Sequence, residues 1–283
     1  MPYPVALAPG HVAVITGAAS GIGLAVAERL AALGMKLALV DTDADGLGRA
    51  RVALEKAHRD TRVLSTVCDV ADRAAVEAFA AEVARHFGSV DFLMCNAGIE
   101  GGGKGVLGDF DVWRRIVEIN LWGTIHVLQT FVPSMVERGR AGSIVVTGSK
   151  QGITCPPGNT PYNVSKSALK TTTEALAHEL RNIKGCRLTV HLLIPGYTYT
   201  GLAKKRGVAE KPEGAWEASQ VVDLMIERMA EGDFYILCPD NETTRAMDEK
   251  RMAWTMGDII ENRPPLSRWH PNYKKAFADY MKG

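Results

Sequence analysis

The stretch "HVAVITGAASGIGLAVAERLAAL", His11 to Leu33, places an apolar run directly before a glycine-rich turn and a helix-forming segment. A run that is apolar at nearly every position is typical of a strand buried on both faces of a sheet. Glycines at 17, 21 and 23 let the backbone turn sharply, and the following helix offers unpaired N–H groups and a positive dipole end. The alternative is an ordinary tight strand–helix turn, but its position after the first strand favours pyrophosphate and dinucleotide binding.

The same strand–helix alternation continues along the chain. Further apolar strands are expected at residues 36–41, 62–69, 90–98, 142–149, 187–196 and 234–240, and helices at residues 21–33, 44–58, 71–87, 110–139 and 162–181. Strands that are apolar on both faces belong in a parallel sheet covered by helices. The sequence therefore predicts an α/β fold, a Rossmann-like doubly wound parallel sheet of about seven strands with helices on both faces.

Composition sets the limits of this prediction. The chain has 283 residues, 46% hydrophobic and 23% charged, with a formal net charge of +1, which suits one large domain or at most two. We expect a single domain over residues 1–283, with a core at 10–200, a variable substrate-side segment at 201–232 and a C-terminal extension at 240–283. Interspersed charges give no basic stripe for nucleic acid and no polybasic patch for a membrane.

Cysteine usage and apolar runs bear on location. The five cysteines lie singly, without the spacing of a metal site, which predicts a reducing compartment and no bound metal. The N-terminus lacks a cationic leader, and no stretch approaches 18 uninterrupted apolar residues. These features favour a cytoplasmic protein.

The second strand ends in Asp41, eighteen residues after Gly23. A carboxylate there can accept hydrogen bonds from the adenosine ribose hydroxyls, and it repels the 2′-phosphate of NADP, so NAD is favoured. The alternative is that Asp41 only caps the next helix, a role that Asp43 or Thr42 could take instead.

The stretch "PYNVSK", Pro161 to Lys166, places a tyrosine four residues before a lysine at the start of an expected helix. Residues at this spacing share a helix face, so the Lys166 ammonium can lower the pKa of the Tyr162 phenol and make it a general acid/base. The alternative is a solvated surface pair, since the spacing is common by chance.

Six motifs in order extend this interpretation. They are the glycine motif, "NAG" at 96–98, Asn120, Ser149 thirteen residues before Tyr162, the Tyr162–Lys166 pair, and "PG" at 195–196. Over about residues 10–200 the chain resembles a classical short-chain dehydrogenase/reductase. The resemblance implies hydride transfer between a nicotinamide cofactor and the CH–OH group of an alcohol, or the corresponding ketone.

The resemblance also implies a catalytic group of Asn120, Ser149, Tyr162 and Lys166. In it Tyr162 is the general acid/base, and Ser149 holds the substrate oxygen. Lys166 lowers the pKa of Tyr162 and binds the nicotinamide ribose. Asn120 lies where its helix kinks, and it holds a water that links Lys166 to bulk solvent.

The cofactor contacts implied by the resemblance lie at the strand ends. Asp69 is expected to contact adenine through its side chain and Val70 through its backbone, while Thr198 and Thr200 compete as a hydroxyl donor, with Thr200 favoured. The whole expected set is Thr16, Gly17, Ser20, Gly21, Ile22, Gly23, Asp41, Asp69, Val70, Asn96, Ala97, Gly98, Tyr162, Lys166, Pro195, Gly196, Thr198 and Thr200.

The substrate pocket is expected to be apolar, with few charges. Its expected lining is Gln151, Ile153, Cys155, Pro156, Tyr197 and Trp216. Such a lining fits a hydrophobic, cyclic or aromatic, secondary alcohol or ketone, with Gln151 orienting one polar group. Because of Lys150 and Lys104, an anionic substrate remains an alternative.

Assembly and function keep alternatives at this stage. By resemblance, the helices at 110–139 and after Tyr162 pair across two-fold axes in a homodimer or homotetramer. The C-terminal extension could close over the pocket or strengthen that oligomer. A non-catalytic NAD-sensing regulatory protein and a sugar-nucleotide epimerase are the competing functions, but the complete catalytic group favours catalysis and the glycine spacing favours the classical branch.

Overall fold

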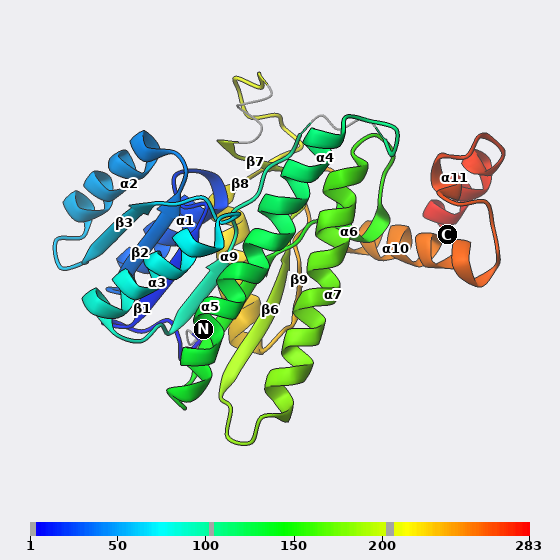
Figure 1. Ribbon diagram of the computed structural model, residues 1–283. Helices are drawn as coiled ribbons and strands as arrows, with labels where there is room; N and C mark the ends of the chain where they lie inside the picture. Colours follow the sequence, from blue (N-terminus) through cyan, green and yellow to red (C-terminus); the bar gives the residue numbers. More distant parts are fainter. Residues whose placement is uncertain (1–3, 102–104, 202–206) are drawn as a thin grey trace.

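The computed structural model describes residues 4–101, 105–201 and 207–283, and within them seven strands form one parallel sheet (Figure 1). The strand order is β3-β2-β1-β4-β5-β6-β9. The strands are β1 Val12–Thr16, β2 Lys36–Asp41, β3 Val63–Val67, β4 Phe92–Cys95, β5 Gly142–Thr147, β6 Leu188–Ile194 and β9 Tyr235–Leu237. This doubly wound sheet confirms the predicted fold class and its single domain.

The order of the strands creates a crevice. After β3 the chain crosses back to β4, which pairs with β1 through Ala13 and Phe92. Loops after β1 and β4 therefore leave the sheet in opposite directions, and ligands of open α/β sheets bind in the crevice between them, at the carboxyl ends of the strands.

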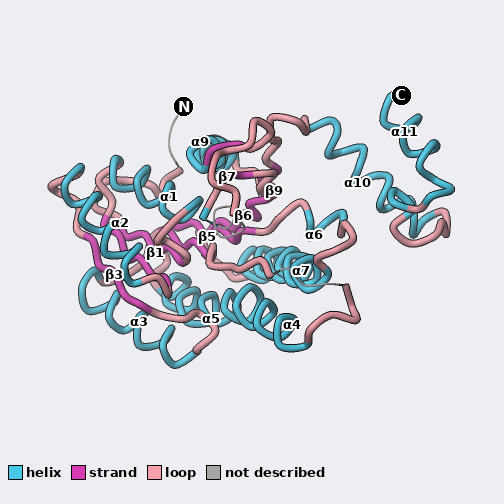
Figure 2. The backbone as a smooth tube through the Cα atoms, turned by 90° about the horizontal axis from the view of Figure 1, so that it is seen from above, coloured by secondary structure: helices cyan, strands magenta, loops and turns pink. Residues whose placement is uncertain are grey.

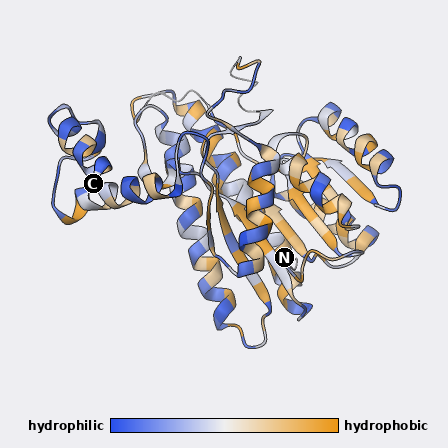
Figure 3. Ribbon diagram, turned by 180° about the vertical axis from the view of Figure 1, so that it is seen from behind, coloured by the Kyte–Doolittle hydropathy of each residue, from blue (hydrophilic) through white to orange (hydrophobic). Residues whose placement is uncertain are grey.

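Helices cover both faces of the sheet, as the view along its upper edge shows (Figure 2). One face packs against α1, α2 and α9, and the other against α3, α5 and α7. Their bounds are α1 Gly21–Ala32, α2 Ala44–Ala57, α3 Arg73–Phe87, α5 Gly123–Glu137, α7 Thr160–Asn182 and α9 Ala218–Glu231. The hydropathy colouring places the apolar residues on the strands between these layers, because a parallel sheet covered on both sides is buried on both sides (Figure 3).

The predicted helix at 110–139 is interrupted. Residues form α4 Phe110–Val117, a π-helical segment Glu118–Trp122, and then α5. The Gly123 N–H donates to the Glu118 carbonyl, five residues back, as a π-helix requires. The periodicity predicted one continuous helix, and the structure corrects this, although the kink expected at Asn120 lies in this segment.

The start of α3 and the segment after β6 also differ from expectation. Helix α3 begins at Arg73 rather than Ala71, because the Asp72 side chain accepts a hydrogen bond from the Ala75 N–H and caps the helix. The segment after Ile194 contains a short parallel ladder between β7 Thr198–Tyr199 and β8 Trp216–Glu217, which the sequence did not predict.

The C-terminal extension forms an arm beside α6 Gln151–Thr154, next to the main body (Figure 1). Its helix α10 spans Arg245–Ile260, and α11 spans Lys274–Lys282. Trp254 of α10 is buried, and its ring lies 5.3 Å from that of Phe277 in α11. Across the described residues, every helix is too short or too polar to cross a membrane.

Candidate active site

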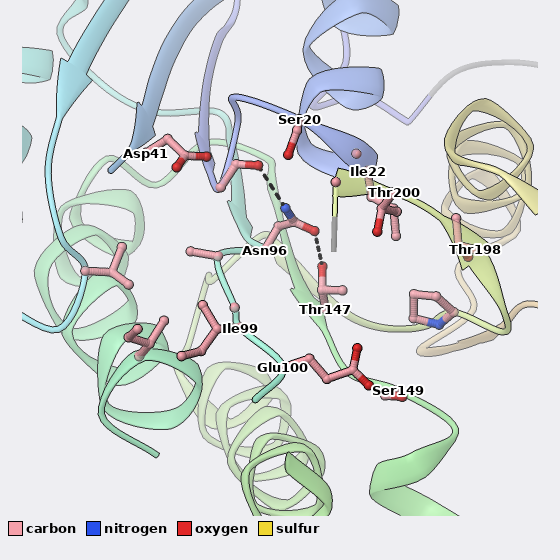
Figure 4. Close-up of a pocket in the computed structure, with 18 of the residues that line it drawn as sticks. Ser20, Ile22, Asp41, Asn96, Ile99, Glu100, Thr147, Ser149, Thr198 and Thr200 are labelled. Atoms are coloured by element: carbon pink, nitrogen blue, oxygen red, sulfur yellow. Dashed lines mark hydrogen bonds between the residues drawn. The ribbon is translucent and has the colours of Figure 1, made fainter. Parts of the chain in front are cut away.

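A cavity of about 700 Å³ lies in the crevice at the carboxyl ends of the strands (Figure 4). Asp41 and Ser20 lie at one end of it, and Ser149 and Glu100 lie at the other. Of the predicted cofactor contacts, its lining contains Gly17, Ser20, Gly21, Ile22, Asp41, Asp69, Val70, Asn96, Ala97, Gly98, Tyr162, Lys166, Pro195, Gly196, Thr198 and Thr200.

The glycine-rich turn has the backbone that a phosphate cradle needs. Gly17 and Gly21 have φ angles of +67° and +58°, which residues with a side chain rarely adopt. A Cβ at Gly23 would lie 2.2 Å from the Gly17 carbonyl oxygen, so the start of α1 packs directly on the turn. Among described contacts, the Ser20 side chain makes no capping bond to α1, whose first N–H groups face the cavity.

Thr16, Asn96 and Thr147 support this turn from behind by joining three strands. The Thr16 hydroxyl accepts from the N–H groups of Asn96 and Ala97, at 2.9 Å each. The Asn96 amide donates to the carbonyls of Thr16 and Gly17 and accepts from the Thr147 hydroxyl at 3.1 Å (Figure 4). Thr16 and Gly23 therefore lie behind the residues that line the cavity. Asn96 connects β1, β4 and β5.

Asp41 and Asp43 have different roles at the end of β2. Asp43 caps α2, because its carboxylate accepts from the Gly46 N–H at 2.9 Å. The Asp41 carboxylate instead accepts from the N–H groups of Ala19 and Asp43, at 3.0 and 3.1 Å, and lines the cavity. Asp43, and not Asp41, therefore caps α2.

An ion pair closes another part of the lining. The Arg115 guanidinium lies 2.6 Å from the Asp69 carboxylate, which also accepts from the Ala71 N–H. Burial opposes ionisation of Asp69, but the hydrogen bonds from Arg115 and Ala71 outweigh it and lower the pKa of the carboxyl. Arg115 was not predicted from the sequence, because the contact joins residues 46 positions apart.

Tyr162 and Ser149 meet at the other end of the cavity. Tyr162 lies in the first turn of α7, and both its side chain and Ser149 line the cavity. Burial raises the pKa of Tyr162, and interaction with the Ser149 side chain opposes this rise only in part. The sequence predicts that Lys166 and the nicotinamide cation together lower this pKa; among the groups of the protein itself, desolvation of the phenolate dominates.

Lys166 is buried, with 5% of its surface exposed. Its Nζ donates to the Thr147 carbonyl at 2.8 Å and lies over the face of the Tyr162 ring, 5.6 Å from its centre. Burial lowers the pKa of Lys166 from its ordinary 10.5 to about 8.

Asn120 lies in the π-helical segment and is fully buried, behind the lining. Its side chain accepts from the Ile99 N–H at 2.8 Å and donates to the Ile99 carbonyl at 3.0 Å and to the Ser165 hydroxyl at 3.1 Å. A Cβ on Gly98 would lie 3.3 Å from the Asn120 amide oxygen and 3.6 Å from Lys166 Nζ. The backbone at Gly98, just after β4, thus lies between Asn120 and Lys166.

Thr198 and Thr200 both line the cavity but face different parts of it. The Thr198 hydroxyl donates to the Gly196 carbonyl at 3.1 Å. Thr200 lies against the glycine-rich turn, since a Cβ on Gly21 would be 3.0 Å from the Thr200 Cβ. This places Thr200, rather than Thr198, beside the cradle (Figure 4).

Of the predicted substrate-pocket residues, Gln151 and Tyr197 line the cavity. The other four lie outside its described lining. Ile153 packs with Leu192, Ile194 and Leu237, and Trp216 packs against the core beside α1 and α9. Cys155 lies 3.5 Å from the Ser167 hydroxyl, and the Pro156 carbonyl accepts from Asn163, so both are held against α7.

Two charged residues accompany the expected apolar residues in the lining. Glu100 lies at the same end of the cavity as Ser149 (Figure 4), and Lys150, the next residue after Ser149, is also in the lining. Lys150 forms ion pairs with Asp240 and Asp248, so its charge is neutralised within the protein. Lys104, the other lysine considered for an anionic substrate, lies outside the described residues.

Comparison with known proteins agrees with this geometry. A family model described as short chain dehydrogenase matches residues 11–211. The 1-deoxy-11-beta-hydroxypentalenate dehydrogenase of Streptomyces exfoliatus is 30% identical over 263 residues, covering 91% of this chain and 93% of that protein. The levodione reductase of Leifsonia aquatica is 34% identical over 214 residues, covering 74% and 78%.

A solved structure extends the agreement to the whole fold. The crystal structure of a short chain dehydrogenase/reductase from Burkholderia phymatum in complex with NAD has a TM-score of 0.82 and 34% sequence identity, and the match covers 91% of this chain and 96% of that chain. The ordered motifs, the doubly wound sheet and the family model agree. This chain therefore belongs to the short-chain dehydrogenase/reductase family of oxidoreductases.

Proposed function

We infer that this protein is an NAD-dependent dehydrogenase or ketone reductase acting on a secondary alcohol or its ketone, with Tyr162 as the general acid/base. The observation that carries the proposal is that Ser149, Tyr162 and Lys166 line the same cavity, with the Lys166 ammonium over the tyrosine ring. A tyrosine beside a buried cation serves proton transfer, and a protein that only senses a nucleotide has no physical need for it.

The residues present fit a dinucleotide. The glycine turn leaves no room for a side chain at Gly23, and the N-terminus of α1 opens onto the cavity. At the other end of the cavity, Lys166 is positioned for a ribose hydroxyl. A bound nicotinamide supplies the hydride acceptor or donor, which this chain does not contain.

Asp41 supports NAD over NADP. Its carboxylate lines the cavity and is held in place by two backbone N–H groups. A fixed negative charge there disfavours the 2′-phosphate of NADP by repulsion, while it can accept hydrogen bonds from ribose hydroxyls.

The raised pKa of Tyr162 bears on the direction of proton transfer. Because burial keeps the phenol protonated near neutral pH, the residues of this chain prepare Tyr162 to donate a proton to a carbonyl oxygen. To accept a proton from an alcohol, Tyr162 must first be a phenolate. A further positive charge near the ring would stabilise the phenolate, and an oxidised nicotinamide would supply that charge. Ser149 would hold the substrate oxygen in line with the phenol in either direction.

Lys166 and Asn120 would complete a path for this proton. Lys166, with its pKa lowered to about 8, can exchange a proton near neutral pH more readily than an exposed lysine. Asn120 holds the strand end at Ile99 beside it, and we infer that a water between them leads to solvent.

We infer a hydrophobic, cyclic or aromatic, substrate. Tyr197 and Ile99 provide apolar lining near Gln151 and Ser149. Relatives named as a hydroxypentalenate dehydrogenase and a levodione reductase support a secondary alcohol or ketone as the reacting group. The neutralised charge of Lys150 argues against an anionic substrate.

The test is a screen of secondary alcohols with NAD and of ketones with NADH, followed by the absorbance of the reduced cofactor. Turnover of a cyclic or aromatic substrate that is lost in Tyr162→Phe supports the proposal. Tight NAD binding without turnover of any substrate would instead favour the NAD-sensing alternative, and turnover of a sugar nucleotide without net change in cofactor would favour an epimerase.

Location and assembly complete the proposal. In the described chain all five cysteines are free, which suits the reducing cytoplasm. We expect a homodimer or homotetramer there. Cell fractionation and light scattering test the two statements separately.

A further inference from the structure

Lys150 directly follows Ser149 and starts helix α6 at the wall of the cavity. Its Nζ lies 2.6 Å from a carboxylate oxygen of Asp248 and 3.3 Å from one of Asp240. The three side chains are 16%, 4% and 8% exposed, respectively. A surface lysine beside an active site is normally solvated, whereas this one is held inside the protein by two acids from the C-terminal part of the chain.

Asp240 connects this lysine to the loop after β6. The carboxylate oxygen that meets Lys150 also accepts from the Tyr197 N–H at 3.2 Å. The other oxygen accepts from the N–H groups of Thr243 and Glu242, at 2.7 and 3.1 Å. The acid is therefore fixed by its own loop and presents one oxygen to both Lys150 and the backbone of Tyr197.

Gly196 lies between these groups. A Cβ on Gly196 would be 2.8 Å from the Asp240 carboxylate and 2.9 Å from Lys150 Nζ. The Pro195–Tyr197 backbone thus rests directly on the ion pair. Ser149 and this backbone both line the cavity, so the Lys150–Asp240 contact links the positions of these two parts of its wall.

Asp248 brings the C-terminal extension into the same contact. It lies in the first turn of α10, a helix capped by Thr244, and Arg251 lies 3.9 Å from its second oxygen. Next to it, Met252 of α10 and Ile153 of α6 pack on the small core of Leu192, Ile194 and Leu237. Helix α10 is therefore attached to α6 by a buried ion pair and by apolar contact.

The charges of this group depend on one another. Burial raises the pKa of Asp248, although Lys150 and Arg251 act to lower it. Burial also opposes ionisation of Asp240, but the Tyr197 N–H and the Lys150 ammonium outweigh it and lower the pKa. Removing one partner leaves the others buried without compensation.

We propose that Lys150, Asp240 and Asp248 form a positioning group through which the C-terminal helix α10 fixes Ser149 relative to the Gly196–Tyr197 backbone. This makes the extension part of the active-site wall rather than a separate appendage. The inference rests on the proposed oxidoreductase function, and it assigns these three residues a role in placing groups, not in bond making. A small displacement of such groups is costly because the reacting atoms must be aligned.

The first test compares Asp248→Asn with Glu249→Gln in the full chain, using the best substrate from the screen. Glu249 is the next residue of α10, and it forms an exposed ion pair with Arg245, so it is a matched removal of one negative charge. We expect Asp248→Asn to lower kcat at least fivefold while the Kd for NADH, measured by fluorescence, changes less than about threefold. Glu249→Gln should leave both values as in the wild type. Thermal unfolding of each variant gives the temperature at which all remain folded, and rates are compared there.

The second test separates positioning from an unpaired buried charge. In Lys150→Met/Asp248→Asn one charge of each sign is removed, so the double variant carries one fewer unpaired buried carboxylate than Lys150→Met, and Asp240 keeps its backbone donors from Tyr197, Glu242 and Thr243. We expect its Tm to recover toward the wild type while kcat stays at least fivefold low. A double variant with wild-type kcat, or Asp248→Asn with wild-type kcat and only a lowered Tm, overturns the positioning role.

The failure of this inference differs from the failure of the proposed function. An inactive wild type that binds no NADH contradicts the proposed function. An active wild type with equally active Asp248 and Glu249 variants contradicts only the positioning group.

Discussion

Lys166 Nζ lies 5.6 Å from the centre of the Tyr162 ring and donates its described hydrogen bond to the Thr147 carbonyl at 2.8 Å. The ammonium therefore lies over the face of the ring, while the Ser149 side chain acts on the phenol. The two residues share a helix face, as their spacing predicted, but burial of both decides their pKa values. Desolvation raises the pKa of the phenol and lowers that of the ammonium.

Replacing Tyr162 with Phe should lower kcat by roughly 100- to 10,000-fold, the usual range for loss of a general acid/base. The phenyl ring keeps the packing but cannot exchange a proton, so the Kd for NADH should change little. Steady-state kinetics and fluorescence titration check the two effects. Residual activity near the wild-type level at neutral pH would contradict the role of Tyr162.

Lys166→Met should reveal the cost of burying the ammonium. The pKa of Lys166 is about 8 in the folded protein and 10.5 ordinarily, so the unfolded chain binds more protons between these pH values. The contribution of Lys166 to the free energy of unfolding therefore rises as the pH increases through this range. The free energy of unfolding of the wild type relative to Lys166→Met should rise by about 3 kcal/mol from below pH 8 to above pH 10.5, at about 1.4 kcal/mol per pKa unit.

Chemical denaturation at a series of pH values measures this difference. Lys170→Met, which removes a lysine with 38% side-chain exposure from the same helix, is the control. A difference between wild type and Lys166→Met that is independent of pH would show that the ammonium is not desolvated as described.

Asp41 should determine cofactor choice. At a separation of about 4 Å and an effective dielectric constant of about 20, one pair of unit charges costs on the order of 4 kcal/mol before screening. We expect the wild type to favour NAD over NADP by at least about tenfold in kcat/KM, and Asp41→Ala to shrink this ratio. An arginine at position 42 in that variant should move it further toward NADP. A wild type that prefers NADP would contradict the assignment.

Arg115→Ala should weaken NAD binding without changing the chemical step. The guanidinium fixes the Asp69 carboxylate at the wall of the cavity, and an exposed pair of this kind contributes up to about 1 kcal/mol. We expect the KM for NAD to rise roughly two- to fivefold at constant kcat. Arg114→Ala is the matched control, since its neighbour Asp111 lies outside the cavity lining. Equal effects of both substitutions would exclude a specific role for Arg115.

Exposed apolar side chains on the packed helices predict self-association. Trp122 and Val164 are 51% and 44% exposed, on the π-helical segment and on α7. Burial of such side chains between copies related by two-fold symmetry would stabilise a dimer or tetramer. Light scattering at micromolar concentration should report a multiple of the chain mass, and a monomer would contradict this prediction.

The sequence predicted the sheet well because its signal is local. In strands such as Lys36–Asp41 the interior positions 37–40 are all apolar and buried, and the glycine turn ends the first strand at a fixed place. The π-helical segment was missed as such because its hydrophobic spacing differs little from that of an α-helix. The hydrogen bonds of Asn120 with Ile99, which accompany it, join residues 21 positions apart and have no local sequence signal.

The substrate end was predicted least well. Ile153 and Trp216 are apolar and lie in the expected segments, but local sequence does not say whether a side chain faces a cavity or the core behind it. The pairing of Lys150 with Asp240 joins residues 90 positions apart, and no sequence pattern near either residue predicts it. Such contacts depend on the tertiary fold, since strand and helix periodicity fixes only the face of a single element.

The π-helical segment Glu118–Trp122 also governs which changes of chain length this protein tolerates. A bond from Gly123 to Glu118 encloses one residue more than an α-helical bond, so deleting a single residue here would restore a regular helix. The shortened backbone could form regular α-helical hydrogen bonds. Because α4 and α5 are each held by their own packing, the deletion would shift Asn120 in register, and its side chain would no longer meet Ile99. At this one place a deletion that regularises the helix should abolish activity, whereas in most helices a deletion is harmful because it disturbs the helix itself.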